Sequence, residues 1–329
     1  MFNASGCLFG LAYGDSLGKP TEFLRYAEIE QRYGPGGPRQ LEGYPALVTD
    51  DTQMTLAVAA ALSGERQPAP AHLAEALRRH FLSWAASPDN NRAPGNTCLQ
   101  ACAELSRGGP WQQASVTGSK GCGANMRVAP VGLVPWYDLD TLAGVSQLQA
   151  GLTHGHPTAL AASELTAYAV RVLREGAALH EVSGLLRARC HDQRLVYRLD
   201  WLGSLWQQPG LDGPDEFISR GWDECLAALD LLDAALAAPD YGGDPCRLTG
   251  AGWVAEEAMS TALLCAVRYA QDPVGGLARA AATSGDSDSI ACLTGAFLGA
   301  AYGMAAWPEE WTSQIEYADL LAGYARLWN

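Results

Sequence analysis

Apolar residues recur with the period of an α-helix along most of the chain. From Asp51 onward they follow at spacings of three and four residues, until Gly64 interrupts the pattern. The other segments with this pattern, all predicted to be helices, are 73–84, 161–172, 216–236, 255–270 and 287–302. No sustained alternation with a period of two is found, so a sheet is not expected.

Breaks that are short relative to the helices separate the predicted elements. They are expected at 33–38, 87–95, 208–214 and 239–252. No shift in composition marks a domain boundary and no internal repeat is found, so residues 1–329 are expected to form one all-α domain of about a dozen or more helices. The last of the apolar segments contains Gly295 and Gly299, which leave room for another helix to approach closely.

Composition is that of a globular protein with a strong acidic balance. Hydrophobic residues make up 48% of the chain, charged residues 18%, and the net charge is −14. This charge argues against binding to nucleic-acid backbones or to anionic lipid. An anionic ligand could still bind if divalent cations reversed the sign of the local potential.

No export signal or membrane span is predicted. Residues 1–8 lack a basic stretch followed by a long apolar core, so no secretory signal is expected. No run of ~18 uninterrupted apolar residues occurs, so no transmembrane helix is expected. The nine cysteines are irregularly spaced, the nearest pair being Cys98 and Cys102. Free buried thiols in a cytoplasmic protein are the expectation.

Two clusters of acidic and hydroxyl side chains stand at predicted helix starts more than two hundred residues apart. One is the run 49–52, with Thr49, Asp50 and Asp51; the other is 284–289. Helix capping would explain the first cluster by itself. If both starts met across a cleft, they would supply four carboxylates and two hydroxyls, enough for two six-coordinate cations. Hard oxygen ligands favour magnesium, manganese or calcium over zinc or copper.

A glycine-rich stretch at 118–123 has its own chemical rationale. Glycines let backbone N–H groups approach a pyrophosphate, although the stretch lacks the spacing of a Walker A loop and a preceding strand, and a flexible turn is the plainer interpretation. Arg127, just beyond it, could bind phosphate or form a structural salt bridge. His154 and His156 have no third ligand nearby, which disfavours zinc.

Six motifs, in this order, resemble those of the ADP-ribosylglycohydrolase family, which includes dinitrogenase-reductase-activating glycohydrolase and the hydrolases of ADP-ribosyl-arginine and ADP-ribosyl-serine. They occupy 6–22, 49–54, 118–130, 153–157, 252–258 and 285–290. The resemblance covers nearly the whole chain. It implies an all-α domain with a pair of magnesium or manganese ions in a binuclear cleft.

Carried over by motif, the resemblance assigns the metal ligands. The first ion would be bound by Thr49, Asp50, Asp51 and Asp288, and the second by Asp286, Asp288 and Ser289. Asp288 would bridge the two ions. Many relatives have threonine at the position of Ser289, and either side chain offers one hydroxyl oxygen.

The same resemblance implies the substrate and its contacts. ADP-ribose would bind near Gly118, Ser119, Lys120, Gly121, Gly123, Met126 and His154. The reaction would be hydrolysis of the glycosidic bond from ADP-ribose to a modified side chain, arginine first, serine or another conjugate second. Glu22 and Asp51 are both candidates for the carboxylate that handles the water. The partner would be an ADP-ribosylated protein or a small conjugate, and a non-catalytic ADP-ribose binder or immunity protein is the alternative class.

Overall fold

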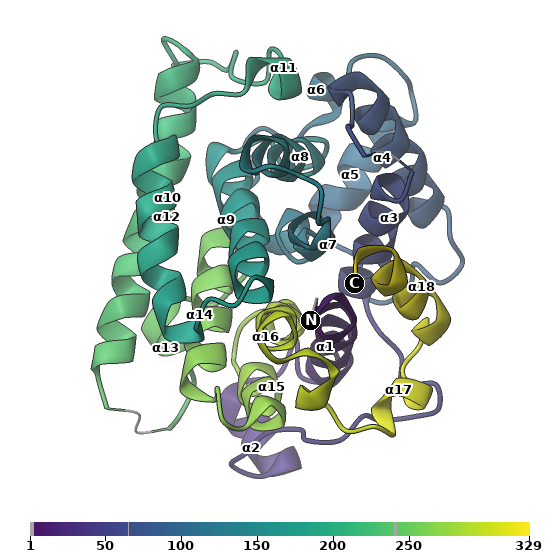
Figure 1. The fold of residues 1–329 in the computed structure, drawn as a ribbon, viewed down its shortest axis with the longest axis vertical. Helices are drawn as coiled ribbons and strands as arrows, with labels where there is room; N and C mark the ends of the chain where they lie inside the picture. The colour runs from purple at the N-terminus through teal and green to yellow at the C-terminus, as the bar shows by residue number, and fades with distance from the viewer. Residues whose placement is uncertain (1–2, 65, 240–241) are drawn as a thin grey trace.

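The computed structural model of the chain describes residues 3–64, 66–239 and 242–329. Helices and their connections make up the whole described fold (Figure 1). The α-helices are α1 (Ala4–Gly18), α2 (Tyr26–Tyr33), α3 (Asp50–Leu62), α4 (Pro70–Ala85), α5 (Asn96–Leu105), α6 (Trp111–Ala114), α7 (Ala129–Leu133), α8 (Leu139–Gly151), α9 (Pro157–Arg174), α10 (Val182–Gln193), α11 (Leu199–Leu202), α12 (Pro214–Ala237), α13 (Cys246–Thr249), α14 (Ala255–Arg268), α15 (Pro273–Ala281), α16 (Ser287–Tyr302), α17 (Trp311–Gln314) and α18 (Ala318–Trp328). Three 3₁₀ helices are η1 (Cys122–Ala124), η2 (Leu179–Glu181) and η3 (Gly303–Ala306).

The helical prediction is confirmed, with one correction. Across the described ranges no strand is found, only isolated bridges such as the one between Gly121 and Val254. The predicted break at 239–252 contains the one-turn helix α13, which is too short for a periodic pattern to reveal, and its residues 240–241 lie outside the described part.

The centre of the fold is an antiparallel pair, α1 and α16, which lie side by side in the lower middle of Figure 1. Glycines make this approach possible. A Cβ atom on Gly295 would lie 1.9 Å from the carbonyl oxygen of Gly10, and one on Gly299 would lie 1.9 Å from that of Gly6. The expectation that small residues permit close helix packing is therefore confirmed. At the far end of the pair, Gly18 of α1 meets the backbone of Asp288 in α16.

One described segment has the length and hydropathy of a membrane span. It is Ser287–Ala306, 20 residues with a mean hydropathy of 1.4, and 72% of its apolar window is buried inside the fold. A core helix of this kind satisfies the same length and hydropathy criteria, so they are weak grounds for a membrane span. The segment packs against α1, α14 and α15, and the absence of a transmembrane helix stays a prediction.

All nine cysteines are free thiols, and eight of them are buried; Cys246 is half-buried. The expectation of free thiols is confirmed, whereas the cytoplasmic location stays a prediction. The remaining layers surround the central pair. Helix α9 packs against α8, α12 and α7, and α3 packs against α4. This arrangement places the first turns of α3 and α16 next to the C-terminal end of α1.

Candidate active site

Asp15 on α1 holds the start of α3 in place. Its buried carboxylate accepts hydrogen bonds from the backbone N–H groups of Thr49 and Thr52, at 2.9 and 3.0 Å, and from both of their hydroxyls, at 2.8 and 2.5 Å. The Thr49 hydroxyl also accepts from the N–H of Asp51, so it is the N-cap of α3 as the capping interpretation expected. Four bonds to one carboxylate fix the direction in which Asp50 and Asp51 project.

The start of α16 is held by α1 and by the turn that follows α1. Gly18 packs directly on the Asp288 backbone, and the Thr21 hydroxyl lies 2.9 Å from that of Ser287. Asp286 is the N-cap residue of α16, but its side chain makes no capping hydrogen bond. Its carboxylate is therefore available to the cleft.

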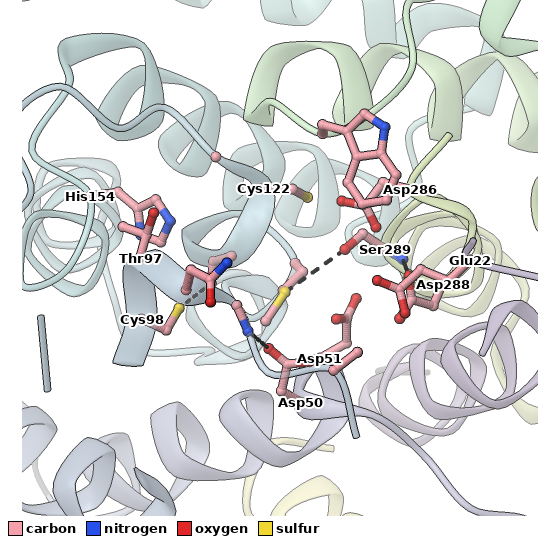
Figure 2. A pocket seen from close by; sticks show the side chains of 17 residues that line it. Glu22, Asp50, Asp51, Thr97, Cys98, Cys122, His154, Asp286, Asp288 and Ser289 are labelled. Carbon is pink, nitrogen blue, oxygen red and sulfur yellow. Dashed lines mark hydrogen bonds between the residues drawn. The ribbon is translucent and has the colours of Figure 1, made fainter. Parts of the chain in front are cut away.

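These elements converge on one cleft, shown in Figure 2. The acidic side chains that line it come from three remote parts of the sequence and point toward one another: Glu22, Asp50, Asp51, Asp286 and Asp288. Carboxylate oxygens of Glu22, Asp286 and Asp288 lie within 4.8 Å of one another. The spatial convergence expected of the two acidic clusters is thus present.

Burial and like charge act on these carboxyl groups together. Burial, followed by the nearby charges of Asp288 and Asp15, raises the pKa of Asp50 to about 7, although the Gly95 N–H opposes the shift. Burial and neighbouring carboxylates also raise the pKa of Asp51 well above its ordinary value. Such a group of ionised acids is unfavourable unless a cation compensates it.

The donor set fits hard divalent cations. Of the described residues that line the cleft, none is a lysine or an arginine, so no side chain of that kind compensates the acids there. Oδ2 of Asp51 is buried and makes no hydrogen bond, which leaves it free to act as a ligand. Ser289 also lines the cleft, whereas Thr49 lies just behind it, with its hydroxyl donating to Asp15.

The glycine-rich segment forms the opposite wall, but only in part. Gly121, Gly123 and Met126 line the cleft, and so does His154. Gly118, Ser119 and Lys120 do not. The Ser119 hydroxyl lies 3.0 Å from that of Thr97 at the start of α5.

Lys120 is placed differently from the sequence expectation. Its ammonium group donates to Glu224 at 2.7 Å and to Glu256, two acids on α12 and α14. The family resemblance predicts that Lys120 lies near bound ADP-ribose. The structure instead ties it to two carboxylates, so a phosphate contact would require the loss of existing ion pairs. Lys120 fastens the loop to the helices behind it.

His154 presents a neutral ring to the cleft. Burial, with Arg127 nearby, lowers its pKa to about 3. Arg127 donates to the Thr153 hydroxyl at 2.8 Å, and that hydroxyl lies 2.8 Å from Nδ1 of His154. Since Arg127 donates to the Thr153 hydroxyl, the proton of that hydroxyl can go to Nδ1 at 2.8 Å or to the Ala150 carbonyl at 3.4 Å. The shorter contact favours donation to Nδ1, which leaves the ring proton on Nε2. Nε2 lies on the side of Gly121 and Gly123.

Arg127 is a structural residue. It is fully buried, and its guanidinium donates to Gln149 at 2.8 Å and stacks over the ring of Phe81, 4.3 Å from its centroid. Neither of the two roles left open by the sequence, a phosphate ligand or a salt-bridge partner, describes these contacts. The partners are neutral side-chain and backbone groups.

Comparison with known proteins now places the chain. The sequence profile described as ADP-ribosylglycohydrolase matches residues 3–329. The chain belongs to the ADP-ribosylglycohydrolase family. A solved structure described as an ADP-ribosylglycohydrolase-related protein complex has the same fold, with a TM-score of 0.68 and 22% identity over 99% of this chain and 97% of that one.

The relatives of this chain with named activities include two bacterial enzymes. The ADP-ribosyl-[dinitrogen reductase] glycohydrolase of Rhodospirillum rubrum is 33% identical over 165 residues, which cover 48% of this chain and 53% of that protein. The ADP-ribosylarginine hydrolase Tri1 of Pseudomonas putida (strain GB-1) is 26% identical over 321 residues, covering 96% and 74%. The resemblance to the ADP-ribosylglycohydrolase family seen in the sequence is confirmed.

Several cleft residues in this family member were not predicted from the sequence. Ala93 and Gly95 line the cleft, although 87–95 reads only as a loop between helices. Trp253 lines it as well, and its ring stacks on the exposed Phe23 with 6.3 Å between centroids. The sequence contains one sign that Asp15 has a special role, because it is an acidic residue inside an otherwise apolar helix. The turn at 92–95 had none.

Proposed function

We propose that this chain is a metal-dependent hydrolase that cleaves the glycosidic bond between ADP-ribose and a modified protein side chain, with arginine as the acceptor. Membership of the ADP-ribosylglycohydrolase family supports the reaction class. The observation that carries the proposal is the meeting of Asp50, Asp51, Asp286 and Asp288 in one cleft with Glu22.

The proposed cations are magnesium or manganese, held by Thr49, Asp50, Asp51, Asp286, Asp288 and Ser289. When bound, they would neutralise the acidic cluster and orient the ribose hydroxyls at the reacting centre. The hard oxygen donors and the unpartnered Oδ2 of Asp51 support this assignment. A single acidic wall without a cation would repel the diphosphate of the substrate.

The protein groups in the cleft divide the remaining work. Cleavage at the anomeric carbon develops positive, oxocarbenium-like charge, which the surrounding carboxylates stabilise. Either Glu22 or Asp51 accepts a proton from the attacking water. Glu22 is half-buried on the turn after α1, whereas Asp51 is buried on α3. Nε2–H of His154 would donate to an oxygen of ADP-ribose on the opposite wall.

Arginine is favoured as acceptor by the charge of the cleft and by one relative. A substituted guanidinium stays cationic. Two divalent cations would offset four of the five carboxylates that line the cleft, which leaves one negative charge to attract the guanidinium. The relative from Pseudomonas putida is named an ADP-ribosylarginine hydrolase. The cytoplasmic site of action is part of the same proposal, and the nine free cysteines support it.

The decisive assay uses two synthetic peptides that carry ADP-ribose, one on arginine and one on serine. Each is incubated with the protein in magnesium, in manganese and in excess chelator. The proposal expects ADP-ribose release from the arginine peptide with cations and none with chelator. Faster release from the serine peptide would reassign the acceptor. Binding of ADP-ribose without release from either peptide would identify a non-catalytic binder instead.

A further inference from the structure

A short turn at 92–95 forms part of the cleft wall and reaches one of the acidic residues directly. Ala93 and Gly95 line the cleft, and the Gly95 N–H donates to Oδ2 of Asp50 at 3.1 Å. Immediately after this turn, Asn96 begins α5. The position of the turn therefore sets one of the hydrogen bonds that orient Asp50.

The backbone of this turn is held in an unfavourable conformation. Ala93 has φ at +51°, in the left-handed region that residues other than glycine seldom adopt. Pro94 follows it and cannot donate a backbone hydrogen bond. Strain of this kind persists only where neighbouring contacts impose it.

The contact next to Ala93 is a forked ion pair. The guanidinium of Arg92 donates to both oxygens of Glu316, at 2.5 and 3.0 Å, and both side chains are only 14% exposed. Glu316 lies between α17 and α18 and is tied back by its own N–H, which donates to the Ala46 carbonyl. The pair thus joins two segments 224 residues apart.

The same ion pair also forms hydrogen bonds with the backbone of Val48, the residue before the N-cap of α3. Arg92 donates to the carbonyl of Val48 at 2.8 Å, and the N–H of Val48 donates to Glu316 at 3.1 Å. Both backbone groups of Val48 are engaged in this way. The ion pair is therefore connected to Asp50 in two ways. One connection is Val48, two residues before Asp50, and the other is the turn from Arg92 to Gly95, whose N–H donates to Asp50.

We propose that Arg92 and Glu316 are positioning residues that set the Asp50 carboxylate for cation binding. The inference rests on the proposed function, because it needs a divalent cation at this cluster. A purely structural ion pair would hold the C-terminal segment in place without influencing the cations. The two roles differ in what happens to cation affinity in the folded protein.

The test measures Mn²⁺ affinity by isothermal titration calorimetry, with thermal unfolding in excess chelator measured in parallel. The variants are Arg92→Ala and Glu316→Gln. The control is Arg194→Ala, which removes one partner of a forked but exposed ion pair with Asp223 on α12. Outer-shell residues around a metal typically change its affinity by about 10–100-fold.

We expect Arg92→Ala to weaken Mn²⁺ binding by about 10–100-fold, and Glu316→Gln, which keeps the shape of the side chain, to weaken it by less. Arg194→Ala should bind as the unsubstituted protein does. Wild-type affinity in a folded Arg92→Ala or Glu316→Gln protein would overturn the inference. If Arg92→Ala does not fold, Glu316→Gln alone decides. An unsubstituted protein that binds no Mn²⁺ would instead contradict the metal dependence in the proposed function.

Discussion

Two sites in this molecule bury a carboxylate to a similar extent, but the charges around the two carboxylates have opposite signs. Glu164 on α9 is fully buried, and its carboxylate accepts from Arg189 on α10 at 2.7 Å and from Gln147 on α8 at 2.7 Å. Asp51 on α3 is equally buried, yet its charged neighbours are Asp288, Asp15, Asp50 and Asp286. Burial raises the pKa of both carboxyl groups, but only at Glu164 does a nearby cation oppose the rise.

The comparison shows that burial of an acid is not by itself a sign of function. The site around Glu164 contains its own counter-charge and is complete as it stands. Beside Asp51, by contrast, none of the described residues that line the cleft is a lysine or an arginine, and the proposed function assigns the compensating charge to bound cations. Missing compensation, rather than burial, is the feature that points to a cation site.

The largest expected effect is on catalysis, at Asp288. Asp288→Asn should lower the rate of ADP-ribose release from the arginine-linked peptide by at least about 100-fold, because a metal ion contributes several kcal/mol to such reactions and each ~1.4 kcal/mol is tenfold in rate. Steady-state rates at saturating magnesium provide the measurement. A rate within tenfold of the unsubstituted enzyme would contradict the role assigned to this carboxylate.

The next effect is on stability, at the complete site. Arg189→Met should lower the free energy of unfolding by about 3–5 kcal/mol, since Glu164 is then buried without its partner. Urea denaturation in excess chelator measures this change in the free energy of unfolding. The hydrolysis rate per folded molecule serves as the control and should not change. A loss below about 1 kcal/mol would contradict the role of Arg189 as the counter-charge of Glu164.

At the acidic cluster around Asp51, a substitution should raise the free energy of unfolding rather than lower it. In excess chelator Asp51→Asn removes a carboxyl group whose ionisation the folded protein opposes through burial and neighbouring acids, so the free energy of unfolding should rise by about 0.5–2 kcal/mol. In saturating Mn²⁺ the unsubstituted protein should instead be more stable than Asp51→Asn, because it binds the ion more tightly and a bound ion stabilises the folded state. Asp223→Asn, at an exposed position, serves as the matched control. A variant that is less stable in chelator would argue against repulsion in the cluster.

An effect of similar size is expected on the neutral wall of the cleft. His154→Ala should weaken ADP-ribose binding by about tenfold, the value of one hydrogen bond to a charged group. With a folded pKa of about 3, His154 stays neutral between pH 5.5 and 8, so the ratio of affinities should not change across that range. Calorimetric titrations at several pH values would reveal a change if the histidine gained charge.

Stability should respond to pH at the same residue. The unfolded chain binds a proton at His154 near its ordinary pKa of about 6.5, whereas the folded protein does not until about pH 3. The contribution of His154 to stability is therefore present above pH 6.5 and declines as the pH falls toward 3. In His154→Ala that part of the acid destabilisation should be absent.

Much of the fold follows from the sequence, because helical periodicity is a local property. The segment predicted at 287–302 coincides with α16, and the run after Asp51 with α3. The acidic clusters were also recognisable, since carboxylates and hydroxyls at two helix starts form an unusual pattern. Their meeting, by contrast, depends on α1 and on bonds between Asp15 and the start of α3, which no local pattern contains.

The contacts that the sequence does not reveal have a common physical origin. Lys120 was expected to lie near ADP-ribose, and a sequence does not reveal that Glu224 and Glu256 lie beside it. Arg127 is buried among neutral partners supplied by other helices. Arg92, next to the turn with Ala93, pairs with Glu316, 224 residues away. In each case a distant segment decides the partner of a charged group.

The most direct test of the central claim is anomalous diffraction from crystals grown with Mn²⁺. Strong anomalous peaks between the carboxylates of Asp50 and Asp51 on one side and Asp286 and Asp288 on the other are the predicted result. The contradicting result is a cleft without any anomalous peak at a saturating Mn²⁺ concentration, or manganese bound only elsewhere on the protein.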